Sequence, residues 1–226
     1  MSIAENIKHY QSQMPAQTQL IAVSKTKPIE DLQQAYDAGQ RLFGENKALE
    51  MRDKHEALPK DILWHFIGHL QTNKVKYIVP FVAMIHSVDS LKLLCEINKE
   101  AKKCGRVVDC LLQVDIAHEE TKFGMDDEQI EQLLISETFK ELENVRICGL
   151  MGIGSITDDM SQTQKEFHHL QELFERIKER FFQNKDSFKH LSMGMSHDYE
   201  VAISEGSTLV RIGSSIFGLR DYGSKN

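Results

Sequence analysis

The sequence predicts an α/β fold, a single (β/α)8 barrel, and three features of its 226 residues support this class. Eight short stretches are apolar and rich in β-branched or aromatic residues, as buried strands are. Longer stretches with helical spacing lie between them, and several end in glycine, a common helix C-terminus. No linker rich in Pro, Ser or Gly interrupts the chain, so one domain over residues 1–226 is expected.

The expected strands are, in chain order, QLIAVSK (19–25), RLFGE (41–45), ILWHFIG (62–68), AMIHSVD (83–89), VVDCLLQVD (107–115), RICGLMGI (146–153), FKHLSMG (188–194) and TLVRIG (208–213). The clearest helices are IEDLQQAYDAG (29–39), SLKLLCEINKEAKKCG (90–105) and SQTQKEFHHLQELFERIKERFF (161–182). Strands that are apolar on both faces and alternate with helices indicate a parallel sheet covered by helices. The count of eight favours a closed barrel over an open doubly wound sheet.

Composition excludes several classes of partner. The 27 basic and 34 acidic residues give a net charge of −7 without any basic block, which argues against nucleic acid. The four cysteines show no C-x-x-C spacing and the N-terminus lacks the regions of a signal peptide, so a reduced, cytoplasmic protein is expected. No apolar run approaches the roughly 20 residues that span a bilayer, so the sequence predicts no membrane insertion.

Lys25 ends the first expected strand. Ile21 and Val23 share its parity along the strand, so its stem could run inside the barrel mouth with the amine at the centre. Most lysines after strands are solvated, and a surface charge remains the alternative. Lys27 has the same parity but lies further out, beside Pro28.

Small residues follow the last two expected strands. LSMGMSHDYEVAISEG places Ser196 before a short helix at about 198–204, and TLVRIGSSIFG opens into Gly213 and Ser214. In barrels this position commonly holds a phosphate, because backbone N–H groups at a helix start favour an anion. Singly, Ser196 suits a helix N-cap and Gly213 a turn. Together, the two segments favour a phosphate site.

Arg211 lies inside the apolar strand LVRIG, where a guanidinium is costly to bury unless its N–H groups find acceptors. A buried salt bridge and a ligand acceptor such as a ring nitrogen are both possible. A lysine amine, a phosphate cup and an arginine facing a ring together describe a site for pyridoxal 5′-phosphate (PLP), joined to Lys25 as a Schiff base.

The chain resembles the PLP-binding YggS/PROSC family, the pyridoxal phosphate homeostasis proteins, over nearly its whole length. The motifs are AVSKTKP, FGEN, WHFIGHLQTNK, HSVDS, GLMGIG, LSMGMSHDYEVAI and GSTLVRIGSSIFG. The resemblance implies a (β/α)8 barrel similar to the N-terminal domain of alanine racemase. It also implies an internal aldimine on the lysine of AVSKTKP.

Carried onto this sequence, the resemblance implies that Lys25 bonds the cofactor and Arg211 faces the pyridine nitrogen. Ser196 and Gly213 contribute to the phosphate cup, and Asn46 lies near the ring. The sequence departs from the family pattern at Asp115, where asparagine is expected, and in GENKALE, where glutamine usually precedes the final glutamate. These departures concern ring contacts and the helix after Asn46.

The expected role is a non-catalytic PLP carrier that takes part in PLP homeostasis and delivery to PLP-dependent apo-enzymes, as a monomer. A small-barrel PLP-dependent amino-acid racemase is the alternative, and a protein-interaction module with a structural cofactor is a third reading. An enzyme like alanine racemase also needs a tyrosine from an additional domain. None of the five tyrosines here stands in a recognisable catalytic context, which favours the carrier.

No metal site is expected. His65 and His69 have i, i+4 spacing, but they straddle a predicted strand end and Gly68. His168 and His169 belong to a long amphipathic helix and are expected at its surface.

Overall fold

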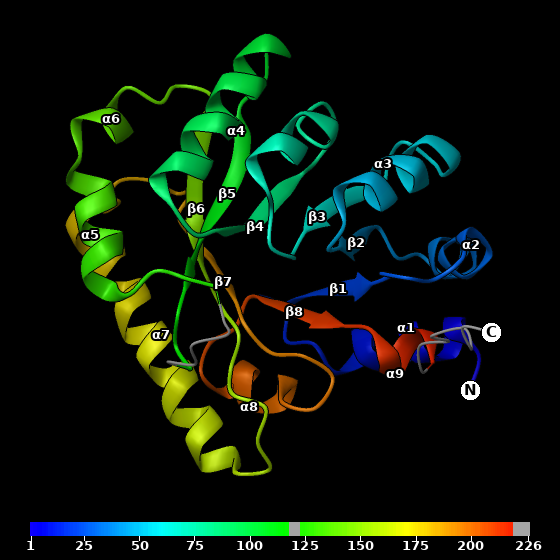
Figure 1. The fold of residues 1–226 in the computed structure, drawn as a ribbon. Coiled ribbons are helices and arrows are strands. Elements are labelled where there is room, and N and C mark those ends of the chain that lie inside the picture. The colour runs from blue at the N-terminus through cyan, green and yellow to red at the C-terminus, as the bar shows by residue number, and fades with distance from the viewer. Residues whose placement is uncertain (118–122, 219–226) are drawn as a thin grey trace, which may run out of the picture.

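The computed structural model describes residues 1–117 and 123–218, and its eight strands close into a parallel barrel in chain order (Figure 1). The strands are β1 (Gln19–Val23), β2 (Leu42–Glu45), β3 (Leu63–Phe66), β4 (Met84–Val88), β5 (Val108–Val114), β6 (Val145–Gly152), β7 (His190–Ser192) and β8 (Leu209–Ile212). β8 pairs with β1 in parallel, which closes the barrel. The predicted (β/α)8 fold is therefore confirmed.

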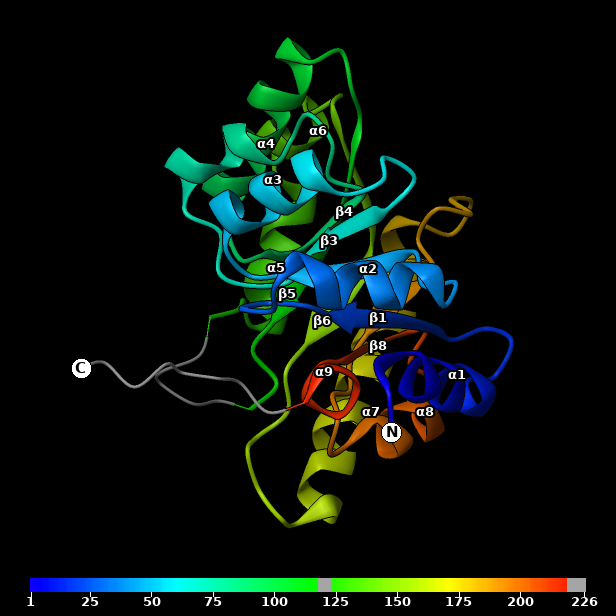
Figure 2. The same cartoon turned by 90° about the vertical axis from the view of Figure 1, so that its right-hand side faces the viewer.

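Helices surround the barrel on its outside (Figure 1). They are α1 (Ile3–Gln13), α2 (Ile29–Asp37), α3 (Ala48–Ala57), the 3-10 helix η1 (Thr72–Tyr77), α4 (Leu91–Lys103), α5 (Asp127–Ile135), α6 (Glu137–Lys140), α7 (Met160–Phe181), α8 (Tyr199–Ser204) and α9 (Ser214–Phe217). The N-terminal α1 lies beside the late α9 (Figure 2), where the Asn6 side chain donates to the Ile216 carbonyl oxygen at 3.0 Å. Among the described helices, none is long and apolar enough to cross a membrane.

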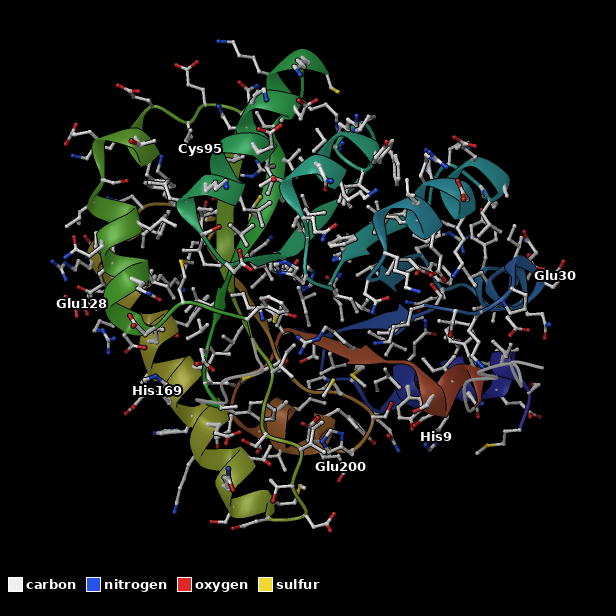
Figure 3. All side chains as sticks on the ribbon, viewed as in Figure 1. His9, Glu30, Cys95, Glu128, His169 and Glu200 are labelled. Carbon is white, nitrogen blue, oxygen red and sulfur yellow. The ribbon has the colours of Figure 1, made fainter. Side chains whose placement is uncertain are left out.

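Alternation along each strand sends side chains to two different cores. A small inner cluster fills the barrel and contains Ile21, Met84, Leu111, Cys148, Met151 and Leu209. A much larger outer cluster packs the other strand faces against the helices. Charged side chains cover the outer helices, as Glu30 of α2, Glu128 of α5 and Glu200 of α8 show (Figure 3). Because β1, β4, β5, β6 and β8 contribute apolar side chains to both cores, these strands show no regular alternation with polar residues in the sequence.

The predicted bounds of the helices and strands can be compared with the structure. The three predicted helices form within one or two residues of their expected ends, and the helix after Asn46 is present as α3. The strand expected at 188–194 is only three residues long, because the chain turns at Gly194, which has φ +93°. A Cβ on Gly194 would lie 2.5 Å from the Ala202 Cβ, so close packing against α8 requires glycine there.

Candidate functional site

A cavity of about 430 Å³ opens at the C-terminal ends of the strands, the position at which barrel enzymes carry their sites. All six residues predicted from sequence line it: Lys25, Asn46, Ser196, Arg211, Gly213 and Ser214. Arg211 belongs to β8, and the other five follow the ends of β1, β2, β7 and β8. The fold thus brings together segments that lie nearly 190 residues apart.

Lys25 lies in a turn with backbone strain. Ile21 belongs to the inner core and Val23 lines the cavity, so strand parity directs Lys25 into the same cavity. The next residue, Thr26, has φ +65°, a conformation that a β-branched residue rarely adopts. Its backbone N–H donates to Glu50 Oε1 at 2.6 Å. Such strain persists only where surrounding contacts impose it.

A buried ion cluster behind the turn supplies those contacts. The Lys54 ammonium donates to Glu45 Oε1 at 2.7 Å and to Glu50 Oε1 at 2.8 Å, and it is almost fully buried. It also donates to the Ser24 carbonyl oxygen at 2.7 Å, while the Ser24 hydroxyl donates to Glu45 Oε1 at 2.6 Å. Burial raises the pKa of Glu45, and Lys54 opposes that rise. The cluster therefore forms hydrogen bonds with Ser24 and Thr26, the two residues that flank Lys25.

Lys27 takes a different direction from Lys25. Its ammonium donates to the Phe217 carbonyl oxygen of α9 at 2.9 Å, and the cavity lining in the described residues does not include it. Two lysines of equal charge and equal strand parity are thus separated by the strained turn at Thr26.

Arg211 is buried without a carboxylate at hydrogen-bonding distance in the described part of the chain. Its guanidinium donates to Ser192 Oγ at 2.6 Å and to the Gly152 carbonyl oxygen at 2.9 Å, both neutral acceptors. Burial lowers the pKa of Arg211 to about 10, and the charge of Asp198 opposes this. The buried salt bridge considered above is absent from these contacts, and the guanidinium stays charged at neutral pH beside the cavity.

The loop after β7 and the start of α9 also line the cavity, next to β8 and β1. Ser196 is not the N-cap of α8, since that position belongs to Asp198, whose carboxylate accepts from the Met195 N–H at 2.5 Å. Gly213 has φ −124°, so it does not need glycine for a left-handed turn. A Cβ there would instead lie 3.1 Å from the Val23 carbonyl oxygen, so Gly213 packs β8 closely against β1.

Polar side chains also fill part of the barrel interior below the cavity, a layer that the sequence analysis missed. His65 Nδ1 lies 2.8 Å from His86 Nε2, and His86 Nδ1 lies 2.9 Å from Ser192 Oγ. His69, by contrast, points to the rim, where it contacts Asp89 and stacks on Phe123. His65 and His69 therefore have different neighbours and point in different directions. This interior layer could have been suspected from the sequence, because His65 and His86 each lie inside an apolar predicted strand.

Further cavity residues were not singled out from sequence as ligands. Gln113 of β5 and His197 of the β7–α8 loop line the cavity, as does Asp115, whose N–H donates to the Met125 carbonyl oxygen. Part of the segment in which the family departure at Asp115 occurs, residues 118–122, lies outside the described residues. Leu49, in the GENKALE departure, is partly exposed at the start of α3 and does not disturb that helix.

The buried histidines predict acid destabilisation. Burial lowers the pKa of His65 to about 3, and burial together with His65 and Arg211 lowers that of His86 well below 6.5. The unfolded chain therefore binds more protons below pH 6.5, and stability present at pH 8 falls as the pH drops. We expect a loss of roughly 2 kcal/mol per buried histidine at pH 5, measured by urea unfolding.

The matched control is His168, which is exposed and has a pKa raised by its hydrogen bond with Glu205. His168→Gln should leave the acid loss in place, whereas His65→Asn should reduce it by roughly 2 kcal/mol at pH 5, because it removes one buried group whose pKa is lowered. A free energy of unfolding that stays constant from pH 8 to 5 would contradict the assignment of both histidines as neutral.

The fold and site define a barrel of the alanine racemase N-terminal class. The model of the alanine racemase N-terminal domain matches residues 1–221. Alanine racemase from E. faecalis superposes with a TM-score of 0.72 over 99% of this chain and 59% of that chain, at 15% identity, which shows likeness of fold alone.

More similar proteins define the family. The pyridoxal phosphate homeostasis protein of Aquifex aeolicus is 44% identical over 204 residues, 90% of this chain and 87% of that protein. That of Pasteurella multocida is 37% identical and covers 97% of this chain and 95% of that protein. The structure of PipY from Synechococcus elongatus with PLP bound superposes with a TM-score of 0.86 at 36% identity, over 96% of this chain and 100% of that chain. The chain therefore belongs to the family of pyridoxal phosphate homeostasis proteins, the YggS/PROSC family.

Proposed function

We propose that this protein binds PLP in the cavity at the barrel mouth, holds it through a Schiff base to Lys25, and serves PLP homeostasis without catalytic turnover. The observation that carries the proposal is the meeting of Lys25, Arg211 and the Ser196, Gly213 and Ser214 wall around one cavity. The cavity volume of about 430 Å³ suits a small cofactor. A relative with 36% identity, PipY, has been solved with PLP bound.

The residues present fit this cofactor. A lysine amine condenses with an aldehyde and releases water, and Lys25 is the lysine among the cavity-lining residues of the described chain. Ser196 and Ser214 offer hydroxyl and backbone donors to a phosphate on one side. Arg211 offers N–H donors to a ring nitrogen from the barrel interior. Asn46 lines the same cavity and can contact the ring.

Arg211 also supports a carrier over an enzyme. Bound PLP supplies an electron sink whose strength rises when the ring nitrogen is protonated. Arginine can only donate hydrogen bonds, so a guanidinium there favours the unprotonated ring and the weaker sink. Of the four tyrosines in the described residues, Tyr10, Tyr36, Tyr77 and Tyr199, none lines the cavity as an acid or base could. The relatives' shared name, homeostasis protein, is consistent with this role.

The finer parts of the proposal concern location and partners. We place the protein in the cytoplasm as a monomer formed by one barrel domain, and we expect it to release PLP to PLP-dependent apo-enzymes. Its net charge of −7 argues against nucleic acid as the main partner.

Chiral turnover separates the carrier from the alternative, an amino-acid racemase. We expect the PLP-loaded protein, incubated with L- or D-alanine and other amino acids, to form the opposite enantiomer no faster than free PLP does. The same preparation should restore activity to a PLP-free apo-enzyme, measured against an equal concentration of free PLP. Racemisation well above the free-cofactor rate would support the enzyme, and failure to activate any apo-enzyme would remove delivery from the proposal.

A further inference from the structure

Four buried side chains form a chain of hydrogen bonds across the barrel interior. His65 of β3, His86 of β4, Ser192 of β7 and Arg211 of β8 are joined by distances of 2.8, 2.9 and 2.6 Å. At most 5% of each residue is exposed. Of these four side chains, Arg211 is the one that lines the cavity in the described part of the protein. The row of hydrogen bonds therefore connects the cavity to the interior below it.

The chemistry of Arg211 favours one direction for these hydrogen bonds. A guanidinium has donors only, so Arg211 donates and Ser192 Oγ accepts. The Ser192 hydroxyl then has one proton to give, and His86 Nδ1 is its acceptor at 2.9 Å. His86 must consequently carry its own proton on Nε2 and donate it to His65 Nδ1. His65 in turn carries its proton on Nε2.

The reverse direction is less favourable. If His65 donated from Nδ1 and His86 donated from Nδ1 to Ser192 Oγ, the serine oxygen would accept twice. Its own proton would then have no acceptor among the described residues, and a buried donor without a partner is costly. Burial keeps both histidines neutral, so each ring has one proton whose position reports the direction.

We propose that Ser192 is a positioning residue for Arg211, and that His86 and His65, both protonated on Nε2, lock the direction of the Ser192 hydroxyl. With its lone pairs turned toward Arg211, Ser192 Oγ accepts a hydrogen bond from one terminal nitrogen of the guanidinium. The Gly152 carbonyl oxygen accepts from the other terminal nitrogen. This orientation leaves the remaining guanidinium donors for a ligand in the cavity. The tautomers and the hold on Arg211 are properties of the cofactor-free protein; only their use toward a ring nitrogen rests on the proposed function.

The test uses NMR on the cofactor-free protein with ¹⁵N-labelled histidine and arginine. Long-range ¹H–¹⁵N spectra should show His65 and His86 protonated on Nε2, and the Arg211 side-chain N–H signals should exchange slowly with water. In Ser192→Ala, His86 should lose its single tautomer and Arg211 exchange should accelerate at least tenfold. Ser192→Thr, which keeps the hydroxyl, should restore both.

Ser87 provides a matched control, since it is a buried serine on β4 whose Oγ has no hydrogen-bond partner among the described residues. Ser87→Ala should change neither the tautomers nor the exchange. Protonation of both histidines on Nδ1 would overturn the proposal, and so would Arg211 exchange that Ser192→Ala leaves unchanged. If Ser192→Ala does not fold, the wild-type tautomers still decide the direction. Titration with PLP is separate: wild type that fails to bind refutes the proposed function and leaves these results standing.

Discussion

Lys25→Ala should abolish the absorbance band of protein-bound PLP Schiff base while leaving the fold intact. In the described residues, Lys25 is the lysine that lines the cavity, so no neighbouring amine replaces it in the same position. The change removes a partly buried side chain after the end of β1 and leaves the inner core untouched. The expected loss of the covalent band is therefore complete, whereas the circular dichroism spectrum and thermal midpoint should change little.

Lys27→Ala is the control for this result. It removes the same charge two residues further along, together with a hydrogen bond to the Phe217 carbonyl oxygen. We expect the band to persist in this variant. Borohydride reduction of the PLP-loaded protein followed by peptide mass analysis should place the label on Lys25. A band that persists in Lys25→Ala, or a label on Lys27, would show that the wrong lysine has been assigned.

The sequence could predict Lys25 and Arg211 at the cavity because a parallel barrel reduces the problem to strand assignment, whereas Asn46 was expected only from the family resemblance. All strands point the same way, so their C-terminal ends meet at one rim, and parity decides which side chains enter it. Lys25 shares parity with Ile21, and Arg211 with Leu209, and both apolar partners lie in the inner core. No knowledge of distant pairing was needed once the strands were correctly located.

The contacts beneath and behind the site needed more than strand parity. His86 and Ser192 lie 106 residues apart and face one another only because β4 and β7 approach across the closed barrel. No local pattern encodes that approach. Similarly, Lys54 lies in the charged stretch EMRDKHEA, which resembles a solvated helix face. Its burial depends on how α3 packs against β2, and the positive φ of Thr26 follows from the same packing.

Lys54→Met should destabilise the fold by about 3–5 kcal/mol at pH 7, the usual cost of breaking a buried ion pair by removing one partner. Glu45 is completely buried, and its Oε2 already lacks a hydrogen-bond partner in the described residues. Without the ammonium, the Glu45 carboxylate keeps the hydrogen bond from the Ser24 hydroxyl, while burial and the charge of Glu50 both disfavour its ionised form. Urea or thermal unfolding measures the loss, and for a chain of this length the midpoint should fall on the order of 10 °C.

Two further variants distinguish a buried charge from simple loss of a side chain. Lys99 forms an ion pair with Glu96 at 3.0 Å but is mostly exposed, so Lys99→Met should cost less than about 1 kcal/mol. Adding Glu45→Gln to Lys54→Met should recover part of the stability, because it removes the uncompensated charge. A double variant as unstable as the sum of both single variants would mean that the two groups do not interact.

The same cluster connects stability to the chemistry of Lys25. Lys54 holds the Ser24 carbonyl oxygen directly, and it also holds Glu50, which accepts from the Thr26 N–H. When Lys54 is lost, these contacts weaken and Thr26 can leave its strained conformation, since the strain of roughly 1–3 kcal/mol is no longer offset. Lys25 would then sample several directions in place of one. We therefore expect Lys54→Met, under conditions where it is still folded, to slow Schiff-base formation with added PLP, while Lys99→Met keeps the wild-type rate.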